Sequence, residues 1–556
     1  MNFSIKIFAT FSFFLFFSSY IFANDQIGSL EYSIRPLIED RKSALEVNLK
    51  LQGNESGITE ILLPSSWAGQ DELYLEISEL CCLSPEATIQ DTDQPEVKKI
   101  IHPSNELIQI SYRVTSKEKP EVEWYYRPLI EQSYFFFFGH CFFIVPKIDE
   151  QIPIQISVDW QEFPKDWALA NSFGNQQKKQ ELLLPLATFQ HAVYAGGDFQ
   201  ILQCGEEQAP IFIAIRGEWS FSNEHLTHLV QTVIESHRKF WNDFDFPYYL
   251  ITVLSTGDDH HMGGTGLFNA FSLFIGDFSE ENEEDWKWLA WLLSHEHFHT
   301  WNGIKMMSCP PEGSLFWFTE GFTEYYAVKL NYRTHLIDTN DYLDHINTIM
   351  YDYYVSSVHN ETNERIQQDF WNDWDVQRLP YVRGFLFALQ WDKKIQEASQ
   401  GQYCLDDFML ALFKHTKENK LPFSQDDIQQ VASLFLPLDV VKEDIKKYIV
   451  DGETILPKEN DFNNMSAVEW MEDIGFNLPL TVSKGKIEGI RRESNAFKAG
   501  LTNGQKFISY QCIDQIISVF VVDRNGSSKE FVYPKESITR LVPQYVLQES
   551  PTKMAL

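Results

Sequence analysis

The chain has 556 residues, of which 44% are hydrophobic and 15% are aromatic. This length exceeds the usual domain of ~150 residues, and the apolar fraction is high enough to fill several cores, so disorder is not expected. The formal net charge is −34 at pH 7. Such a negative surface repels nucleic acids and anionic membranes, and nucleic-acid binding is therefore excluded.

The first 23 residues have the pattern of a signal peptide. Lys6 is followed by a mostly apolar stretch at 7–17, and Ala23 is a small residue at a suitable cleavage position. The alternative is a membrane anchor, but the stretch is short for a span of ~20 residues and no basic cluster follows it. We expect residues 1–23 to be removed, which leaves no stable membrane anchor and a periplasmic or secreted chain.

Residues 24–204 consist of short runs in which apolar residues alternate, such as 44–51 (ALEVNLKL) and 107–114 (LIQISYRV). This period and the turn residues between the runs predict an N-terminal β-sandwich. The apolar run 134–145 (YFFFFGHCFFIV) is interrupted by Gly139 and is too short to span a membrane. It predicts two buried strands joined by a turn.

The seven cysteines form no regular framework, and an odd number leaves at least one thiol unpaired. Export permits disulfides. A bond between the neighbours Cys81 and Cys82 would strain the backbone. Few or no structural disulfides are expected.

The pattern of the chain changes after residue 204. In 205–335 we expect strands at 211–215, 248–254 and 266–275 and helices at 223–241, 286–301 and about 314–330. Acidic residues at 280–285 suit a helix N-terminus, where the macrodipole favours negative charge. Residues 336–458 are expected to be largely helical, 459–540 to return to short strands, and 541–556 to form a tail. The predicted fold class is multidomain α+β.

The segment 294–302 (SHEHFHTWN) contains the pattern H-E-x-x-H at His295, Glu296 and His299. Side chains four residues apart project from one face of a helix, so the two imidazoles can bind one zinc ion. Glu296 lies beside them and is predicted to be the base that takes a proton from the attacking water. Composition alone gives this pattern in at most roughly 6% of such chains, but the preceding apolar WLAWLL indicates a buried helix.

An open catalytic zinc site needs a third protein ligand, and Glu320 in the segment 315–326 (LFWFTEGFTEYY) can supply it. An unpaired carboxylate among so many aromatic residues would be costly to bury, and metal coordination removes that cost. Glu324, four residues later, is predicted to accept the free N–H of a ligating histidine. One zinc ion per chain is expected. His297, on another helix face, is interpreted as structural.

The pair His260 and His261 is interpreted as two loop residues that could border the cleft.

Three segments resemble metallopeptidase family 61, the glycyl aminopeptidase family of gluzincins: 295–302 (HEHFHTWN), 317–326 (WFTEGFTEYY) and 380–384 (PYVRG). The resemblance implies a thermolysin-like catalytic domain at 205–335 and a PDZ-like domain at 459–540, flanking the helical domain. It also implies that Tyr381 donates a hydrogen bond to the oxyanion in the transition state. From the residues alone, a core aromatic is the alternative.

One departure from the family concerns the edge strand of the cleft. Relatives carry a Gly-Leu-Glu-His type segment, and the aligned residues here are 266–269 (GLFN). The family's Glu binds the free amino terminus of the substrate through an ion pair, a role that Phe268 cannot fill. The backbone of Gly264 and Gly266 could still pair with an extended substrate, so these two residues and Phe268 are the predicted substrate-binding residues.

In the PDZ-like segment, 474–476 is expected to be the carboxylate-binding loop and 495–504 (NAFKAGLTNG) the turn before the next strand. Such modules capture extended peptides by strand addition. A purely structural role is the alternative.

These observations predict an exported zinc-dependent peptidase acting on peptide or protein substrates. A rival from another class is a non-catalytic peptide-binding protein with a structural metal site. The sequence leaves open the natural substrate, the exo- or endopeptidase mode and the oligomeric state.

Overall fold

The computed structural model describes residues 28–39, 42–116, 124–257, 262–456, 464–473, 486–487, 490, 494–513, 515–522 and 527–545. The predicted signal peptide, His260 and His261, and the expected loop 474–476 lie outside the described residues. The chain divides into two compact units, Met1–Thr300 and Trp301–Leu556.

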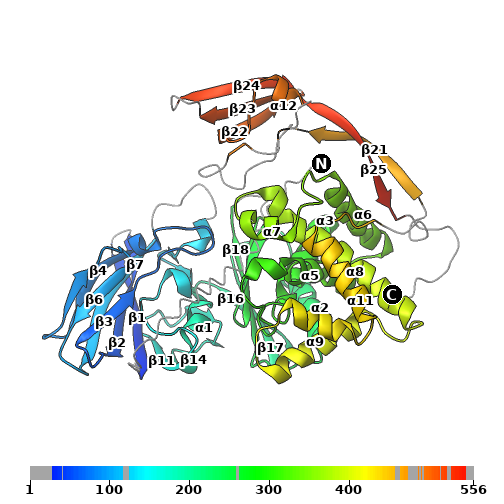
Figure 1. The fold of residues 1–556 in the computed structure, drawn as a ribbon. Coiled ribbons are helices and arrows are strands. Elements are labelled where there is room, and N and C mark those ends of the chain that lie inside the picture. The colour runs from blue at the N-terminus through cyan, green and yellow to red at the C-terminus, as the bar shows by residue number, and fades with distance from the viewer. Residues whose placement is uncertain are drawn as a thin grey trace. The chain divides into compact units, whose positions relative to one another are not determined.

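The first unit begins with strands that form three sheets, as predicted for a β-rich N-terminal region (Figure 1). A six-stranded sheet has the order β14-β11-β1-β2-β7-β4, and its strands are β1 (Ser29–Glu39), β2 (Lys42–Gln52), β4 (Ile77–Cys82), β7 (Leu107–Thr115), β11 (Pro153–Trp160) and β14 (Lys179–Pro185). Strands β1 and β11 pair in parallel, and the other neighbours are antiparallel. A four-stranded sheet has the order β10-β3-β6-β5, with β3 (Ile58–Leu62), β5 (Thr88–Asp91), β6 (Val97–Ile101) and β10 (Val145–Pro146).

The third sheet has the order β13-β12-β15-β9-β8, with β8 (Leu129–Ile130), β9 (Tyr134–Phe138), β12 (Ala168–Asn171), β13 (Gly174–Asn175) and β15 (Val193–Gly197). Short helical turns lie between strands of these sheets: η1 (Leu73–Glu76), η2 (Trp124–Tyr126), η3 (Gly139–Cys141) and α1 (Leu186–Gln190).

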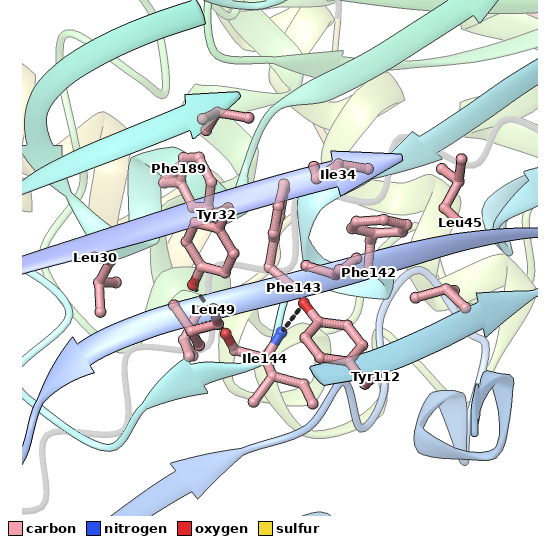
Figure 2. Packing of buried hydrophobic residues seen from close by; sticks show 14 of the residues in the cluster. Leu30, Tyr32, Ile34, Leu45, Leu49, Tyr112, Phe142, Phe143, Ile144 and Phe189 are labelled. Carbon is pink, nitrogen blue, oxygen red and sulfur yellow. Dashed lines mark hydrogen bonds between the residues drawn. The ribbon is translucent and has the colours of Figure 1, made fainter. Parts of the chain in front are cut away.

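The core of these sheets contains two tyrosines whose hydroxyls bond one backbone segment. Tyr32 donates to the carbonyl of Ile144 at 2.8 Å, and the amide of Ile144 donates to Tyr112 at 3.3 Å (Figure 2). Both rings are almost fully buried. A buried hydroxyl without a partner is costly, so these two bonds allow large aromatic side chains to fill the core.

Strand β9 explains the apolar run at 134–138. Phe135 and Phe137 belong to the same core as Tyr32, whereas Phe136 and Phe138 belong to a second core with Leu250. Because side chains alternate across a strand, a strand buried on both faces is apolar at every position. The first of the two predicted buried strands is confirmed as β9. The second is wrong, because the rest of the run forms η3 and an irregular segment, and only its last residue, Val145, belongs to a strand, β10.

The first unit ends with a sheet of order β16-β17-β18-β20-β19 and two helices. These elements are β16 (Gln200–Glu206), β17 (Ala209–Arg216), α2 (Asn223–Trp241), β18 (Tyr249–Ser255), β19 (Met262–Leu267), β20 (Ala270–Ile275) and α3 (Glu283–Phe298). Helix α2 has the predicted bounds. Its N-cap is Ser222, whose hydroxyl accepts from the backbone N–H of His225.

The predicted single strand at 266–275 is wrong. The segment spans two antiparallel strands, β19 and β20, joined by a turn at Phe268 and Asn269. Asn269 has φ of 50°, a left-handed conformation that asparagine adopts more readily than most residues. The nearly continuous apolar run concealed this turn. Strand β19 does lie at the edge of the sheet, as expected.

The second unit is largely helical up to residue 450, as predicted. Its helices are η4 (Glu312–Leu315), α4 (Phe316–Thr319), α5 (Gly321–Arg333), α6 (Thr339–Val355), α7 (Asn363–Asp369), α8 (Trp374–Ala398), α9 (Leu405–Asn419), α10 (Gln425–Ala432), α11 (Leu438–Asp444) and the π-helical η5 (Ile445–Val450). The helix expected over about 314–330 is interrupted at Glu320, where α4 ends and α5 begins.

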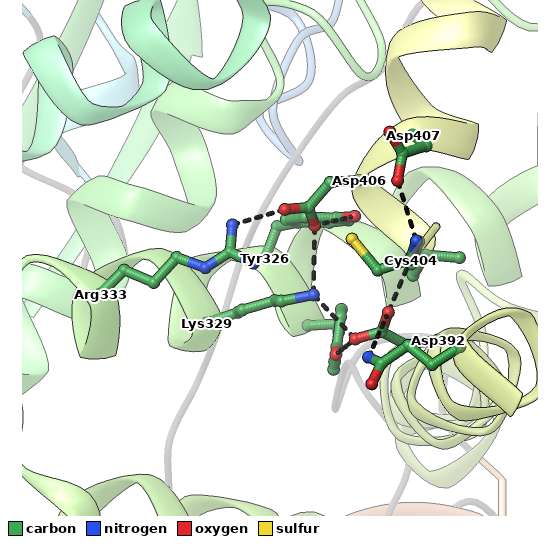
Figure 3. A network of polar contacts seen from close by, with 10 residues as sticks. Tyr326, Lys329, Arg333, Asp392, Cys404, Asp406 and Asp407 are labelled. Atoms are coloured by element: carbon green, nitrogen blue, oxygen red, sulfur yellow. Dashed lines mark hydrogen bonds and ion pairs between the residues drawn. The ribbon is translucent and has the colours of Figure 1, made fainter. Parts of the chain in front are cut away.

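A buried ion network joins α5, α8 and α9 (Figure 3). The ammonium of Lys329 lies 2.7 Å from Asp392 and 3.1 Å from Asp406, and Arg333 contacts Asp406 at 2.6 Å. Asp392 also accepts from the hydroxyl of Tyr325 at 2.6 Å. Burial alone would raise the pKa of Asp392, but the charge of Lys329 and these hydrogen bonds outweigh burial and lower it.

The C-terminal segment returns to strands, as predicted. A two-stranded ribbon pairs β21 (Asn464–Asp473) with β25 (Glu536–Gln544), and a three-stranded sheet contains β22 (Lys506–Ile513), β23 (Ile516–Val522) and β24 (Ser528–Pro534). This sheet and α12 (Asn495–Lys498) share a small core of their own around Leu501 and Val519.

Two observations concern the whole described chain. All seven cysteines carry free thiols. Among the described helices, none has the length and apolar character needed to cross a membrane.

Candidate metal centre

Helix α3 positions the first two candidate ligands. Its first turn contains Glu283, Glu284 and Asp285, whose charges suit the positive end of the helix dipole. The helix ends at Phe298 and not at the predicted residue 301. His299 follows as the C-cap and keeps a right-handed helical conformation (φ −61°, ψ −18°), so the four-residue spacing from His295 is preserved.

The rings of His295 and His299 point toward a common position. Their Nε2 atoms lie 3.2 Å apart, and each residue is 1% exposed. Two imidazoles bound tetrahedrally at ~2.0–2.1 Å would have nitrogens about 3.3 Å apart. The two histidines therefore have the separation that a shared metal ion requires.

Glu320 completes a group of three. One ligand atom from each of His295, His299 and Glu320 lies within 4.8 Å of the other two, and all three residues are buried. Within the described part of the chain this is the one group of three histidine, cysteine or acidic residues close enough to hold a metal ion. Two imidazoles and a carboxylate are the donor types of a catalytic zinc site.

Glu296 follows His295 on α3 and is 2% exposed. Its charge affects Tyr249 on the neighbouring strand β18. Burial is the main cause that raises the pKa of Tyr249, the Thr300 hydroxyl lowers it by a hydrogen bond, and Glu296 raises it further. Tyr249 therefore lies within electrostatic range of the predicted base. The sequence offered no signal for it beyond its place at the start of an apolar strand.

Glu324 lies one turn after Glu320 on α5 and is 1% exposed. Its Oε1 lies 3.2 Å from Nε2 of His345 on α6. His345 was not predicted, because nothing in the local sequence distinguishes it from other helix residues. The expected bond from Glu324 to a ligating histidine stays a prediction.

Tyr381 lies on α8, a helix that packs against α4 and α5. Its side chain is 5% exposed, and the guanidinium of Arg378 lies 6.0 Å from the centre of its ring.

The three predicted substrate-binding residues lie on or next to the edge strand β19. The hydroxyl of Tyr126 donates to the carbonyl of Gly264 at 3.5 Å. Phe268 follows the strand in the turn, where its amide donates to the carbonyl of His191 at 2.9 Å and its ring lies 5.7 Å from that of Phe173. The amide of Phe268 is therefore engaged within the protein.

The fold and this group of side chains are those of a metallopeptidase-like protein, with the H-E-x-x-H pattern on α3 and a candidate carboxylate ligand at the junction of α4 and α5. Residues 288–381 match the family model described as M61 glycyl aminopeptidase. This match covers the segment that contains the candidate ligands and Tyr381, so over that segment the chain is similar to the M61 metallopeptidases.

One solved structure shares the fold at low sequence identity, and another is less similar. An aminopeptidase N family protein from Idiomarina loihiensis superposes with a TM-score of 0.69 at 14% identity, covering 92% of this chain and 98% of that one. An M1 zinc metallopeptidase from Deinococcus radiodurans gives a TM-score of 0.46 at 12% identity, covering 78% and 96%. No curated protein matches the sequence.

Proposed function

We propose that the chain is an exported peptidase that binds one zinc ion through His295, His299 and Glu320. The observation that carries this proposal is the 3.2 Å separation of the two Nε2 atoms, with the Glu320 carboxylate in the same buried group. When bound there, zinc would supply a Lewis acid that polarises the scissile carbonyl and makes water a better nucleophile at neutral pH.

Glu296 acts as the general base in this proposal. It takes a proton from the attacking water and passes it to the leaving amine as the peptide bond breaks. Tyr381 donates a hydrogen bond to the oxyanion that develops on the attacked carbonyl. Glu324 orients a ligating histidine, and the backbone of Gly264 and Gly266 pairs with the extended substrate.

We also propose the finer domain architecture and the export. Residues 205–335 form a thermolysin-like catalytic domain, 336–458 a helical domain and 459–540 a PDZ-like domain, and 1–23 direct the chain to the periplasm or outside the cell. The separate core around Leu501 and Val519 supports a distinct C-terminal module.

Metal content and activity test the central proposal together. Purified protein should contain about one zinc ion per chain, and it should lose peptide cleavage on chelation and regain it on addition of zinc. Glu320→Ala should bind zinc more weakly, whereas Glu281→Ala, an exposed residue before α3, should not. Cleavage at an unchanged rate by metal-free protein would reject the mechanism. Metal binding without any cleavage would favour the non-catalytic peptide-binding protein.

The mode of cleavage depends on Phe268. A phenylalanine cannot form an ion pair with a free amino terminus, so the enzyme should accept peptides whose amino terminus is blocked. Cleavage rates of free and acetylated forms of the same peptides measure this. Phe268→Glu should shift the preference toward free amino termini. A strong preference of the wild type for free amines contradicts the proposal.

A further inference from the structure

Behind the metal-binding face of α3 lies a buried histidine of α2 that contacts two residues of one helical turn. Nε2 of His237 lies 2.9 Å from the hydroxyl of Ser294, and its Nδ1 lies 3.1 Å from Nδ1 of His297. All three residues are 0% exposed. Ser294 and His297 are the residues on either side of the pair His295 and Glu296.

These contacts are directional. Two facing ring nitrogens can bond only if one carries a hydrogen and the other does not, and a neutral histidine has one of each. His237 can therefore donate to one neighbour and accept from the other. His297 is held from another side by the ring of Tyr249, which meets it edge-on at 4.7 Å. Apolar packing alone would leave α3 freer to turn about its axis.

The rotation of α3 matters because side-chain atoms lie far from the helix axis. A turn of about 10° moves an atom at a radius of ~6 Å by about 1 Å. Metal–ligand distances tolerate only about ±0.2 Å. A displacement of about 1 Å would therefore misplace His295 relative to the other candidate ligands, and Glu296 relative to the metal.

We propose that His237 is a positioning residue, which sets the rotation of α3 through Ser294 and His297 and so aims His295 at the metal. The inference rests on the proposed function. It explains why a polar ring is buried between two helices where an apolar side chain would fill the space.

Two alternative roles for His237 lead to different experimental outcomes. The facing nitrogens of His237 and His297 could themselves bind a second metal ion, although no third ligand from the described residues joins them in a group. Alternatively, His237 could serve only to pack α2 against α3. His225 provides a matched comparison, because it lies on the same helix and stacks on α3 at a ring distance of 3.7 Å, but its partner Trp286 is not next to the candidate ligands in the chain.

The experiment measures zinc affinity by competition with a chromophoric chelator, and the absorption spectrum of the Co²⁺-substituted protein. His237→Phe should weaken zinc binding 10–100-fold, the usual loss when a group supporting a ligand is removed, and should change the Co²⁺ spectrum. His237→Asn can still reach His297, and His237→Gln can still reach Ser294, so each should restore part of the affinity. His225→Phe should leave both readouts unchanged.

Wild-type affinity and spectrum in folded His237→Phe would overturn the inference. An equal loss in His225→Phe would do the same, because it would indicate general packing. Two zinc ions in the wild type and one in His237→Phe would assign the pair to a second metal site. If His237→Phe does not fold, the zinc affinities of His237→Asn and His237→Gln decide. Weaker zinc binding than in the wild type by both variants supports the inference, and wild-type affinity in both overturns it. Absence of zinc from the wild type would instead refute the proposed function.

Discussion

Gly321 and Gly384 bring two helices into backbone contact directly after Glu320. A β-carbon on Gly384 would overlap the carbonyl oxygen of Trp317 and lie 2.7 Å from Cα of Gly321. A β-carbon on Gly321 would overlap the backbone of Gly384 and lie 2.8 Å from the carbonyl oxygen of Pro380. Helix α8, which carries Tyr381, is thereby held against the junction that presents Glu320.

Gly384→Ala should therefore disturb both stability and the site. Forcing a methyl group between two backbones typically costs 1–3 kcal/mol, and here neither backbone can move aside without shifting Glu320 or Tyr381. Urea unfolding and kcat measure the two effects. Gly313→Ala is the control, because its β-carbon would meet no atom closer than 3.4 Å. Equal behaviour of the two variants would show that the close approach is unimportant.

Glu296→Gln removes the proposed base and keeps the shape of the side chain. We expect kcat to fall by about 10²–10⁴, the contribution of a positioned general base, while zinc content is retained. Glu284→Gln, at an exposed position of the same helix, should cleave normally. Wild-type turnover by Glu296→Gln would remove this residue from the mechanism.

Tyr381→Phe removes only the proposed hydrogen-bond donor. The loss should appear in kcat, by about 10²–10³, with little change in KM, because the oxyanion exists only in the transition state. Steady-state kinetics with one peptide distinguish the two parameters, and Tyr403→Phe at an exposed position is the control. A variant that changes KM alone would point to substrate binding.

Lys329→Met should destabilise the second unit. Removing one partner of a buried ion pair costs about 3–5 kcal/mol, and the bonds that Asp392 keeps with Tyr325 and the amide of Leu405 favour the lower end. Lys414→Met breaks an exposed pair and should cost about 0–1 kcal/mol. Denaturant unfolding measures the free energy of unfolding of both variants. Adding Asp392→Leu to Lys329→Met should recover stability, and a further loss would argue against charge burial as the cause.

Stability should fall as the solution becomes acidic. Burial lowers the pKa of His191 to about 4 and of His237 to about 3, from an ordinary 6.5. Below pH 6.5 the unfolded chain binds protons at these positions and the folded chain does not. Their contribution is thus complete above pH 6.5 and is lost toward pH 3–4, with a slope of up to about 2.7 kcal/mol per pH unit for the two groups.

Urea unfolding of wild type and His237→Gln at pH 7, 6 and 5 measures this dependence. The variant should be less sensitive by about 1.4 kcal/mol per pH unit, because one proton fewer is taken up on unfolding. Identical pH dependence of the two proteins would mean that His237 titrates normally in the folded state.

Local patterns in the sequence predicted much of the fold. The bounds of α2 follow from apolar residues at helical spacing between Ser222 and Asn242, which are its N-cap and C-cap. The strand nature of 134–138 follows from its aromatic content and its length. The turn at Phe268 was not predicted because Leu267 and Phe268 lead almost directly into the apolar strand β20, and hydrophobic periodicity does not reveal where such a run reverses.

The sequence by itself determined which residues can hold the metal, because His295 and His299 depend only on the four-residue repeat of one helix and Glu320 on the aromatic segment around it. The tertiary structure decided what surrounds them: His237 behind α3, His345 beside Glu324, and α8 against Glu320. Each of these contacts joins residues far apart in the chain. Such pairings depend on how whole elements pack, which no local spacing of residue types encodes.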